Sequence, residues 1–203
     1  MRRSLIISLA LPFTFTLGLG AAFADIAPPP RKPESKPPVA PPPAAPIPKG
    51  EMARAEIKGT DGKTLGTASL EQTPHGVLIN ANLSGLAPGM HAFHIHETGK
   101  CEPPFKSAGG HFNPEGHKHG LKNPAGLHAG DLPNVDVGAD GKARFQFFAQ
   151  GVTLEAGKKN SLFDADGSAL VVHKEADDLA SDPAGAAGDR IGCGVVEKEA
   201  SKK

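Results

Sequence analysis

Residues 94–131 are the segment that most restricts how this chain can fold. They read HIHETGKCEPPFKSAGGHFNPEGHKHGLKNPAGLHAGD, with six histidines, one cysteine and a closing aspartate among frequent Gly, Pro and Asn. That composition cannot maintain a regular helix or strand for long. Histidines at this density are costly in an ordinary core, because each buried ring nitrogen needs a partner. A metal site would supply those partners, so the segment predicts a loop-rich metal centre.

The first 50 residues have the pattern of an export signal followed by a spacer. Residues 1–24 begin with two arginines, continue through an apolar run and end in Ala-Phe-Ala, which predicts a cleavable signal peptide and a periplasmic protein. An uncleaved membrane anchor is the alternative, which Pro12 and the marginal length of the apolar run disfavour. Both Sec and twin-arginine export stay open. Residues 25–50 are dominated by proline and predict a disordered, extended linker, with docking to a proline-reading domain as the alternative.

Residues 51–203 are expected to form one domain, since about 150 residues suffice for a single core. The whole chain is formally neutral. Residues 1–50 carry six basic and two acidic side chains, which leaves the domain with a net charge of −4 when histidine is neutral. This balance does not favour nucleic acid or an anionic membrane as a partner.

Short β-rich runs between turn signals predict an all-β domain. The runs are 51–59, 64–72, 76–86, 90–97, 134–150, 168–174 and 191–198, and Asp-Gly pairs at 61–62 and 140–141 mark hairpin turns. No helical period exceeds two turns, which favours an antiparallel sandwich or a flattened barrel.

The histidine spacing predicts the chemistry. His94 and His96 are two residues apart in a predicted strand, so both side chains should leave one face of the sheet. An isolated pair of this kind would be ordinary surface histidines. Here the pair opens a series that continues along the chain: His111, His119, His128, Asp131 and, on a distant strand, His173. Three nitrogens and one carboxylate suit tetrahedral zinc, whereas three or four imidazoles suit copper.

Five motifs resemble the copper/zinc superoxide dismutase family in order and spacing. They are HAFHIHE, SAGGHFNPEGHKHG, HAGDLPN, ALVVHKEADD and GDRIGCGV, and the similarity covers residues 51–198. This family is a known case of the β-sandwich fold and of electrostatic steering of a substrate. Both expectations for this chain therefore come from the resemblance. The resemblance implies a Greek-key antiparallel β-sandwich or flattened eight-stranded barrel with long metal-binding and electrostatic loops. It also implies an enzyme that disproportionates superoxide to dioxygen and hydrogen peroxide and so protects the cell envelope.

The resemblance further implies a role for each site residue. Copper, one per subunit, would be bound by His94, His96, His111 and His173. Zinc, one per subunit, would be bound by His111, His119, His128 and Asp131. His111 would bridge the two ions as an imidazolate and would take up and pass on a proton. Asp177 would link a copper-ligand imidazole to a zinc-ligand imidazole, those of His94 and His119, and Arg190 would hold the superoxide anion.

The remaining cysteines and histidines have simpler expected roles. Cys101 and Cys193 correspond to the family's intrasubunit disulfide, which an oxidising compartment would maintain; two free thiols are the alternative. We expect His91 to be structural and His75 to be solvated. His117 could compete for zinc, but only His119 keeps the family spacing.

The sequence also departs from the pattern of cytosolic relatives. The loop 174–189 is short and carries five acidic residues against one lysine, so it cannot provide a strongly positive channel. Lys106 is the candidate to draw superoxide in. These features resemble the bacterial periplasmic branch of the family.

Two other functions stay open at this point. One is a non-enzymatic copper- or zinc-binding module that buffers or delivers metal. The other is a proline-tethered structural domain of the envelope, stabilised by its metal. The sequence also leaves both a monomer and a homodimer open.

Overall fold

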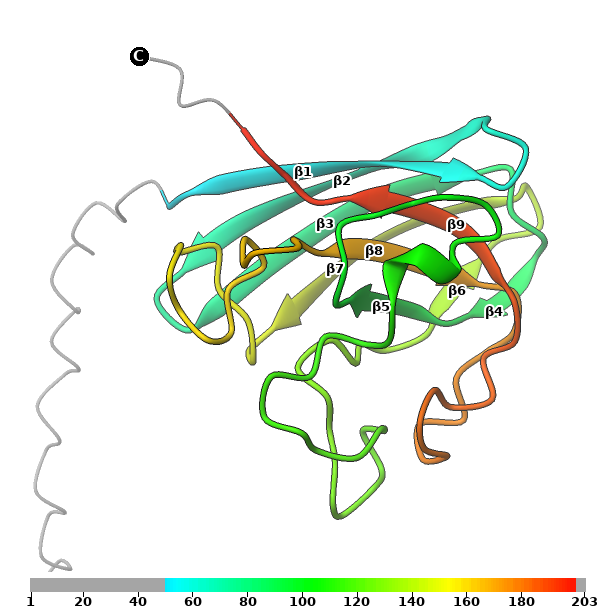
Figure 1. The fold of residues 1–203 in the computed structure, drawn as a ribbon. Coiled ribbons are helices and arrows are strands. Elements are labelled where there is room, and N and C mark those ends of the chain that lie inside the picture. Colours follow the sequence, from blue (N-terminus) through cyan, green and yellow to red (C-terminus); the bar gives the residue numbers. More distant parts are fainter. Residues whose placement is uncertain (1–49, 200–203) are drawn as a thin grey trace, which may run out of the picture. The chain divides into compact units, whose positions relative to one another are not determined.

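The computed structural model describes residues 50–199 (Figure 1). The predicted signal peptide, nearly all of the predicted linker and residues 200–203 lie outside the described residues. Within residues 50–199, no helix is long and apolar enough to cross a membrane.

The described residues form an antiparallel β fold with one short 3₁₀ helix, which confirms the predicted fold class (Figure 1). The strands and the helix, in chain order, are β1 (Met52–Gly59), β2 (Thr64–Thr73), β3 (Gly76–Ser84), β4 (Gly89–His91), β5 (Phe93–His96), η1 (Lys106–Ala108), β6 (Val135–Val137), β7 (Lys142–Ala149), β8 (Ala169–His173), β9 (Arg190–Val195) and β10 (Glu197–Lys198). An eight-stranded sheet has the order β5-β8-β9-β1-β2-β3-β7, with β10 paired to β1, and β4 pairs with β6 separately. The chain crosses from β3 to β4–β5 and from β7 to β8, the non-sequential connections of a Greek key.

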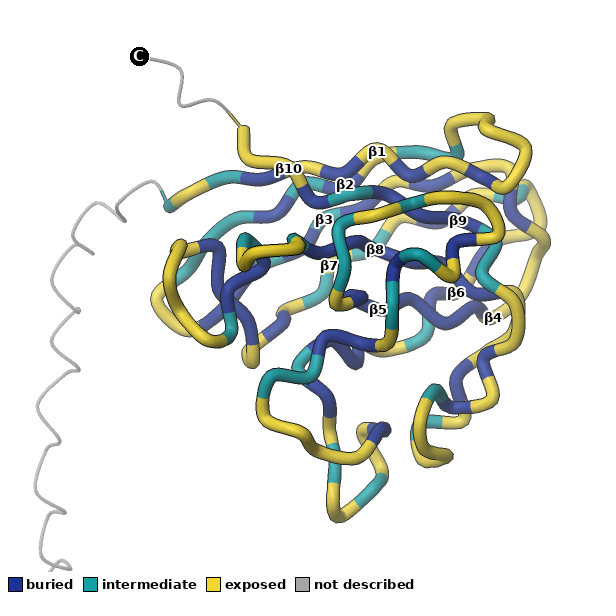
Figure 2. Tube along the Cα trace, viewed as in Figure 1, coloured by how far each residue is buried: buried dark blue, intermediate teal, exposed yellow. Residues whose placement is uncertain are grey.

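Alternation of buried and more exposed residues along the long strands, clearest in β1, produces the core. In β1, Ala53, Ala55 and Ile57 are buried while the residues between them are exposed, as expected for a sheet with one solvated face (Figure 2). The buried residues of β2 and β3 join the same cluster, in which Phe93 of β5 packs edge-to-face on Phe145 of β7 with ring centroids 5.0 Å apart.

Strand β8 differs because all five of its residues are buried. Leu170 and Val172 face the main core. Ala169 and Val171 face a second apolar cluster that includes Phe105 from the loop between β5 and β6. That loop therefore packs on the outer face of the sheet.

Two predicted strands are divided in the structure. The run 90–97 splits at Ala92 because β4 pairs with β6 whereas β5 pairs with β8. The run 191–198 splits into β9 and β10, and both parts pair with β1 at different points. The Glu199 backbone N–H also donates to the Met52 carbonyl, at 2.9 Å, so the two ends of the described chain lie side by side.

Candidate metal centre

Two strands and one bulge position the first group of histidines. His94 and His96 of β5 are both fully buried and leave the face opposite Phe93 and Ile95, which enter the core. His173 ends β8, where the register with β9 shifts so that His173 stands opposite Arg190. A bulge of this kind redirects side chains at the edge of a site. It brings Arg190 beside the histidine group.

The second group comes from residues 111–131, a connection with no helix or strand of its own. An isolated bridge between His96 and His111 attaches its start to β5. At its other end Asp131 closes the connection, because its Oδ2 accepts the backbone N–H groups of Gly120 (2.8 Å) and His128 (3.0 Å). One carboxylate therefore organises this connection.

The structure brings the predicted ligands together in two groups of buried side chains. One potential ligand atom from each member lies within 4.8 Å of those of the other members. The groups are His94, His96, His111 and His173, and His111, His119, His128 and Asp131.

In the first group, hydrogen bonds fix which ring nitrogen carries a proton. The Nδ1–H groups of His96 and His173 donate to the carbonyls of Gly109 (3.1 Å) and Gly188 (3.4 Å). Their Nε2 atoms, which then carry lone pairs, face each other at 3.3 Å. His94 donates through Nε2–H to Asp177 at 2.8 Å, which leaves its buried Nδ1 without a partner. Lone pairs that converge in a buried space repel one another unless a cation lies between them.

In the second group, three ring nitrogens surround one oxygen. The Nδ1 atoms of His111, His119 and His128 lie 2.8, 2.9 and 3.3 Å from Asp131 Oδ1. His119 donates its other N–H to Asp177 at 3.0 Å, so its Nδ1 holds a lone pair that faces a carboxylate oxygen. Three nitrogens and one oxygen are a donor set that zinc accepts. Both groups therefore fit a bound cation.

His111 belongs to both groups. Its Nδ1 faces Asp131, and its Nε2 is buried and has no hydrogen-bond partner. The ring centroid lies 4.0 Å from that of His94 and 5.1 Å from that of His119. One imidazole can thus offer one nitrogen to each group.

Burial keeps three histidines of the first group neutral and ready to bind metal. It lowers the pKa of His94 to about 4 and that of His173 to about 3, and it lowers the pKa of His96 well below its usual value. For Asp131, burial opposes ionisation, but hydrogen bonds from His111 and the Gly120 N–H lower its pKa to about 2. The Asp131 carboxylate is therefore charged and the rings of His94, His96 and His173 are uncharged near neutral pH.

Asp177 joins the two groups outside the ligand atoms. It accepts from His94 through Oδ2 and from His119 through Oδ1. These two hydrogen bonds, with that from the Leu179 N–H, outweigh burial and hold the pKa of Asp177 far below its usual value. Gly185 makes room for this contact, because a Cβ there would overlap Asp177 Oδ1.

Arg190 is held by two backbone carbonyls of the loop that covers β8. Its Nη1 donates to Phe105 at 2.7 Å and its Nη2 to Gly109 at 2.6 Å. The Gly109 carbonyl therefore accepts from both Arg190 and His96. The only sequence signal near this contact is the Gly-Gly pair before His111. A disulfide joins Cys101 to Cys193, as predicted, and ties the same loop to β9.

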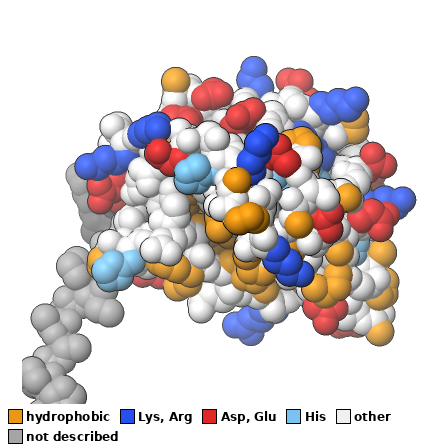
Figure 3. Space-filling model, turned by 90° about the horizontal axis from the view of Figure 1, so that it is seen from below, with side chains coloured by type: hydrophobic (Ala, Val, Ile, Leu, Met, Phe, Trp, Pro, Cys, Tyr) orange, Lys and Arg blue, Asp and Glu red, His pale blue; other side chains and the backbone are white. Residues whose placement is uncertain are grey.

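The remaining predicted residues lie outside the two groups. His75 and His117 are exposed, and His117 contacts the Leu127 carbonyl through Nδ1 at 3.1 Å. His91 is buried, with its ring nitrogens 2.9 Å from the His173 carbonyl and 2.8 Å from the Ala87 carbonyl, a contact with a ligand residue that the sequence did not indicate. Lys106 is exposed on η1. On the face seen in Figure 3, hydrophobic side chains gather in the middle and basic and acidic side chains are scattered around them.

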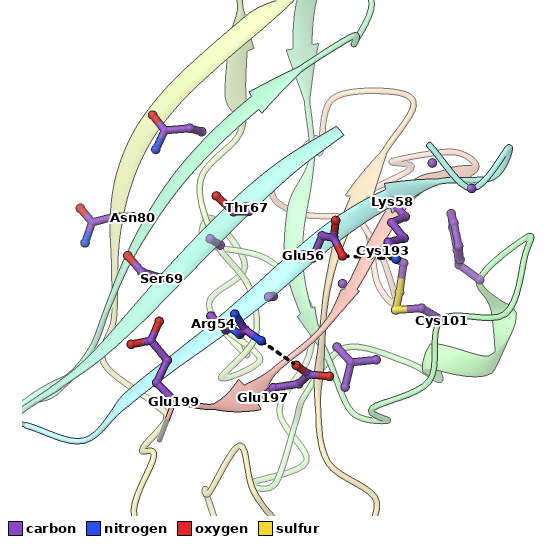
Figure 4. Close-up of a pocket in the computed structure, with 18 of the residues that line it drawn as sticks. Arg54, Glu56, Lys58, Thr67, Ser69, Asn80, Cys101, Cys193, Glu197 and Glu199 are labelled. Atoms are coloured by element: carbon purple, nitrogen blue, oxygen red, sulfur yellow. Dashed lines mark ion pairs between the residues drawn. A yellow bond between two sulfur atoms is a disulfide. The ribbon is translucent and has the colours of Figure 1, made fainter. Parts of the chain in front are cut away.

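A groove among the described residues lies away from both groups. Its volume is about 890 Å³, and it runs over the outer face of β1, β2 and β9 beside the disulfide (Figure 4). Four of its charged side chains form pairs, Arg54 with Glu197 at 4.0 Å and Lys58 with Glu56 at 3.2 Å. None of the predicted ligands lines it. The groove is therefore separate from the histidine groups.

Comparison with known proteins agrees with this geometry. Residues 64–196 match the family model described as copper/zinc superoxide dismutase. A "Superoxide dismutase [Cu-Zn] 2" of Aquifex aeolicus (strain VF5) is 56% identical over 146 residues, which cover 71% of this chain and 85% of the relative. Among solved structures, a SOD-like protein from Bacillus subtilis is 41% identical with a TM-score of 0.68 and covers 70% of this chain and 96% of its own. The Cu/Zn superoxide dismutase from Brucella abortus is 30% identical with a TM-score of 0.59, covering 72% and 100%.

Proposed function

Because the chain belongs to the copper/zinc superoxide dismutase family, we propose that it disproportionates superoxide to dioxygen and hydrogen peroxide at the two histidine groups. The observation that carries the proposal is the shared position of His111, with one nitrogen directed to each group. A simple metal-binding module needs no such sharing. A shared imidazole can couple a change of charge at one ion to the uptake or release of a proton.

The two groups differ in the ions that they would hold. His94, His96, His111 and His173 would bind copper, which supplies the one-electron redox couple that superoxide disproportionation requires. His111, His119, His128 and Asp131 would bind zinc, whose closed shell fixes the ligands without redox chemistry.

Three residues of the chain would then serve the reaction. His111 would release and regain a proton at Nε2, the buried nitrogen on the side of the first group, and would pass it to the peroxide product. Arg190 would hold superoxide beside the first group, because its guanidinium is permanently charged and two carbonyls fix its direction. Asp177 would keep His94 and His119 in their tautomers.

We also propose that the protein acts in the periplasm and protects the cell envelope. The disulfide between Cys101 and Cys193 supports an oxidising compartment. The signal peptide predicted for residues 1–24 is the other support.

The test is superoxide removal by the purified chain, loaded with copper and zinc. We expect rapid removal that is lost on copper chelation, returns on copper addition and is insensitive to peroxide scavengers. Copper and zinc binding without superoxide turnover would overturn the proposal and would favour the metal-buffering module.

A further inference from the structure

A side chain outside both ligand groups fixes the backbone of Asp177. The Nδ2–H of Asn134 donates to the Asp177 carbonyl at 2.8 Å, and the Asp177 N–H donates to Asn134 Oδ1 at 2.8 Å. An amide side chain can pair with a peptide group in this way because it carries one donor and one acceptor side by side. The pair joins residues 43 positions apart in the sequence.

Asn134 also lies close in sequence to the carboxylate that organises the second group. It follows Asp131 by three residues, just before β6 begins at Val135. Asp177, on the other side of the pair, orients His94 of the first group and His119 of the second. Asn134 is therefore a second contact, beside the hydrogen bond from His119, that fixes Asp177 to the segment around the second group.

The Asp177 carboxylate can reach both histidines only if the backbone of Asp177 stays in place. Its loop (residues 174–189) contains no helix or strand. Oδ1 must meet both the Leu179 N–H and His119, while Oδ2 must meet His94. A shift of the Asp177 backbone would lengthen the bonds to both histidine groups at once.

We propose that Asn134 is a positioning residue that couples the two metal sites through Asp177. The proposal rests on the proposed function only in taking the two groups to be the copper and zinc sites. It predicts that removing the amide of Asn134 frees the Asp177 backbone and so loosens the hydrogen bonds of Asp177 to both His94 and His119.

The test compares Asn134→Ala with a matched control, Asn113→Ala, in the full chain loaded with copper and zinc. Asn113 makes the same kind of pair, with the N–H and carbonyl of His117, but does not contact Asp177. Zinc release to a chromogenic chelator should be about tenfold faster in Asn134→Ala, at the low end of effects seen for groups that orient metal ligands, and less than about threefold faster in the control. The copper(II) electron paramagnetic resonance spectrum should change in Asn134→Ala alone, because His94 turns.

A double-mutant cycle with Asp177→Asn decides whether Asn134 acts through Asp177. We expect Asn134→Ala to add little in that background, whereas an independent tenfold effect would overturn the proposal. Equal zinc release by the two alanine variants, or an unchanged copper spectrum, would also overturn it. If Asn134→Ala does not fold, Asn134→Ser, which keeps one hydrogen-bonding group, is expected to show an intermediate effect in the same measurements. A wild-type chain that binds both metals without turnover would refute the proposed function and leave this coupling testable by release and spectrum.

Discussion

The two ligand groups are built from different kinds of backbone. His94, His96 and His173 stand on the edge strand β5 and its neighbour β8, which hydrogen-bond to each other in the sheet. His119, His128 and Asp131 stand on a connection whose own order depends on one carboxylate and a few turns. Only His111 belongs to both groups, and an isolated bridge to His96 attaches it to the sheet.

This difference assigns distinct physical roles to the two sites. A site on strands is preorganised by the fold, so its ligands are in place before metal arrives. A site on a connection gains order when metal binds, and part of the metal-binding free energy appears as local folding. The copper ligands on the sheet should therefore hold their positions without metal. Bound zinc, by contrast, should stabilise the connection that supplies Asp131.

The largest expected effect is on hydrogen exchange after zinc is removed with a chelator. Protection of the Gly120 and His128 amides, which donate to Asp131, should fall by about 100-fold or more because the connection opens locally. Amides of β8 and β9 should change by less than about threefold. Equal loss in both regions would show that the two groups do not differ in this way.

Ligand substitutions should show the same asymmetry in metal binding. Asp131→Ala should abolish zinc binding and also weaken copper binding by about tenfold or more, because His111 and the Asp177 network lose their support. His96→Ala should weaken copper binding while zinc affinity stays within about threefold. Titration calorimetry of the metal-free variants measures both affinities, and a large loss of zinc affinity in His96→Ala would contradict the comparison.

Acid should release zinc at a higher pH than copper. Metal binds the unprotonated ring, so a ligand with a higher pKa meets competition from protons earlier as the pH falls. Burial lowers the pKa of His94 to about 4 and of His173 to about 3, whereas the pKa of His119 is raised, because Asp177 and Asp131 outweigh its burial. The midpoint of zinc release should lie about one pH unit or more above that of copper. Metal analysis after dialysis across pH 7 to 3 measures both midpoints, and the reverse order would count against this account.

The smallest effect concerns Lys106, an exposed residue that belongs to neither group. Lys106→Glu should lower the rate of superoxide removal a few-fold at low ionic strength and flatten its salt dependence, while metal content stays unchanged. Lys63→Glu, at an exposed turn between β1 and β2, is the matched control. Pulse radiolysis at several salt concentrations measures the rate, and an unchanged salt slope would exclude Lys106 from steering.

The sequence predicted the groups better than it predicted the hydrogen bonds that hold them. The spacing of His94 and His96 indicates a shared strand face, since alternation is a property of any strand. The run 90–97 gave no sign of its break at Ala92, because a change of partner strand has no local signature. Composition and spacing do not encode contacts between backbone groups and side chains far apart in the chain. Two such contacts are the Gly109 carbonyl with its two donors and the pair of Asn134 with Asp177.

The hydrogen bond between Glu199 and Met52 has a consequence for how the domain can be rebuilt. Since the described residues 50–199 begin and end at neighbouring points, a short peptide could join these points, and the domain could be reopened at the exposed Asp61–Gly62 turn. Every ligand residue would keep its place in such a circular permutant. The strands would be synthesised in a different order, but the two histidine groups would stay the same.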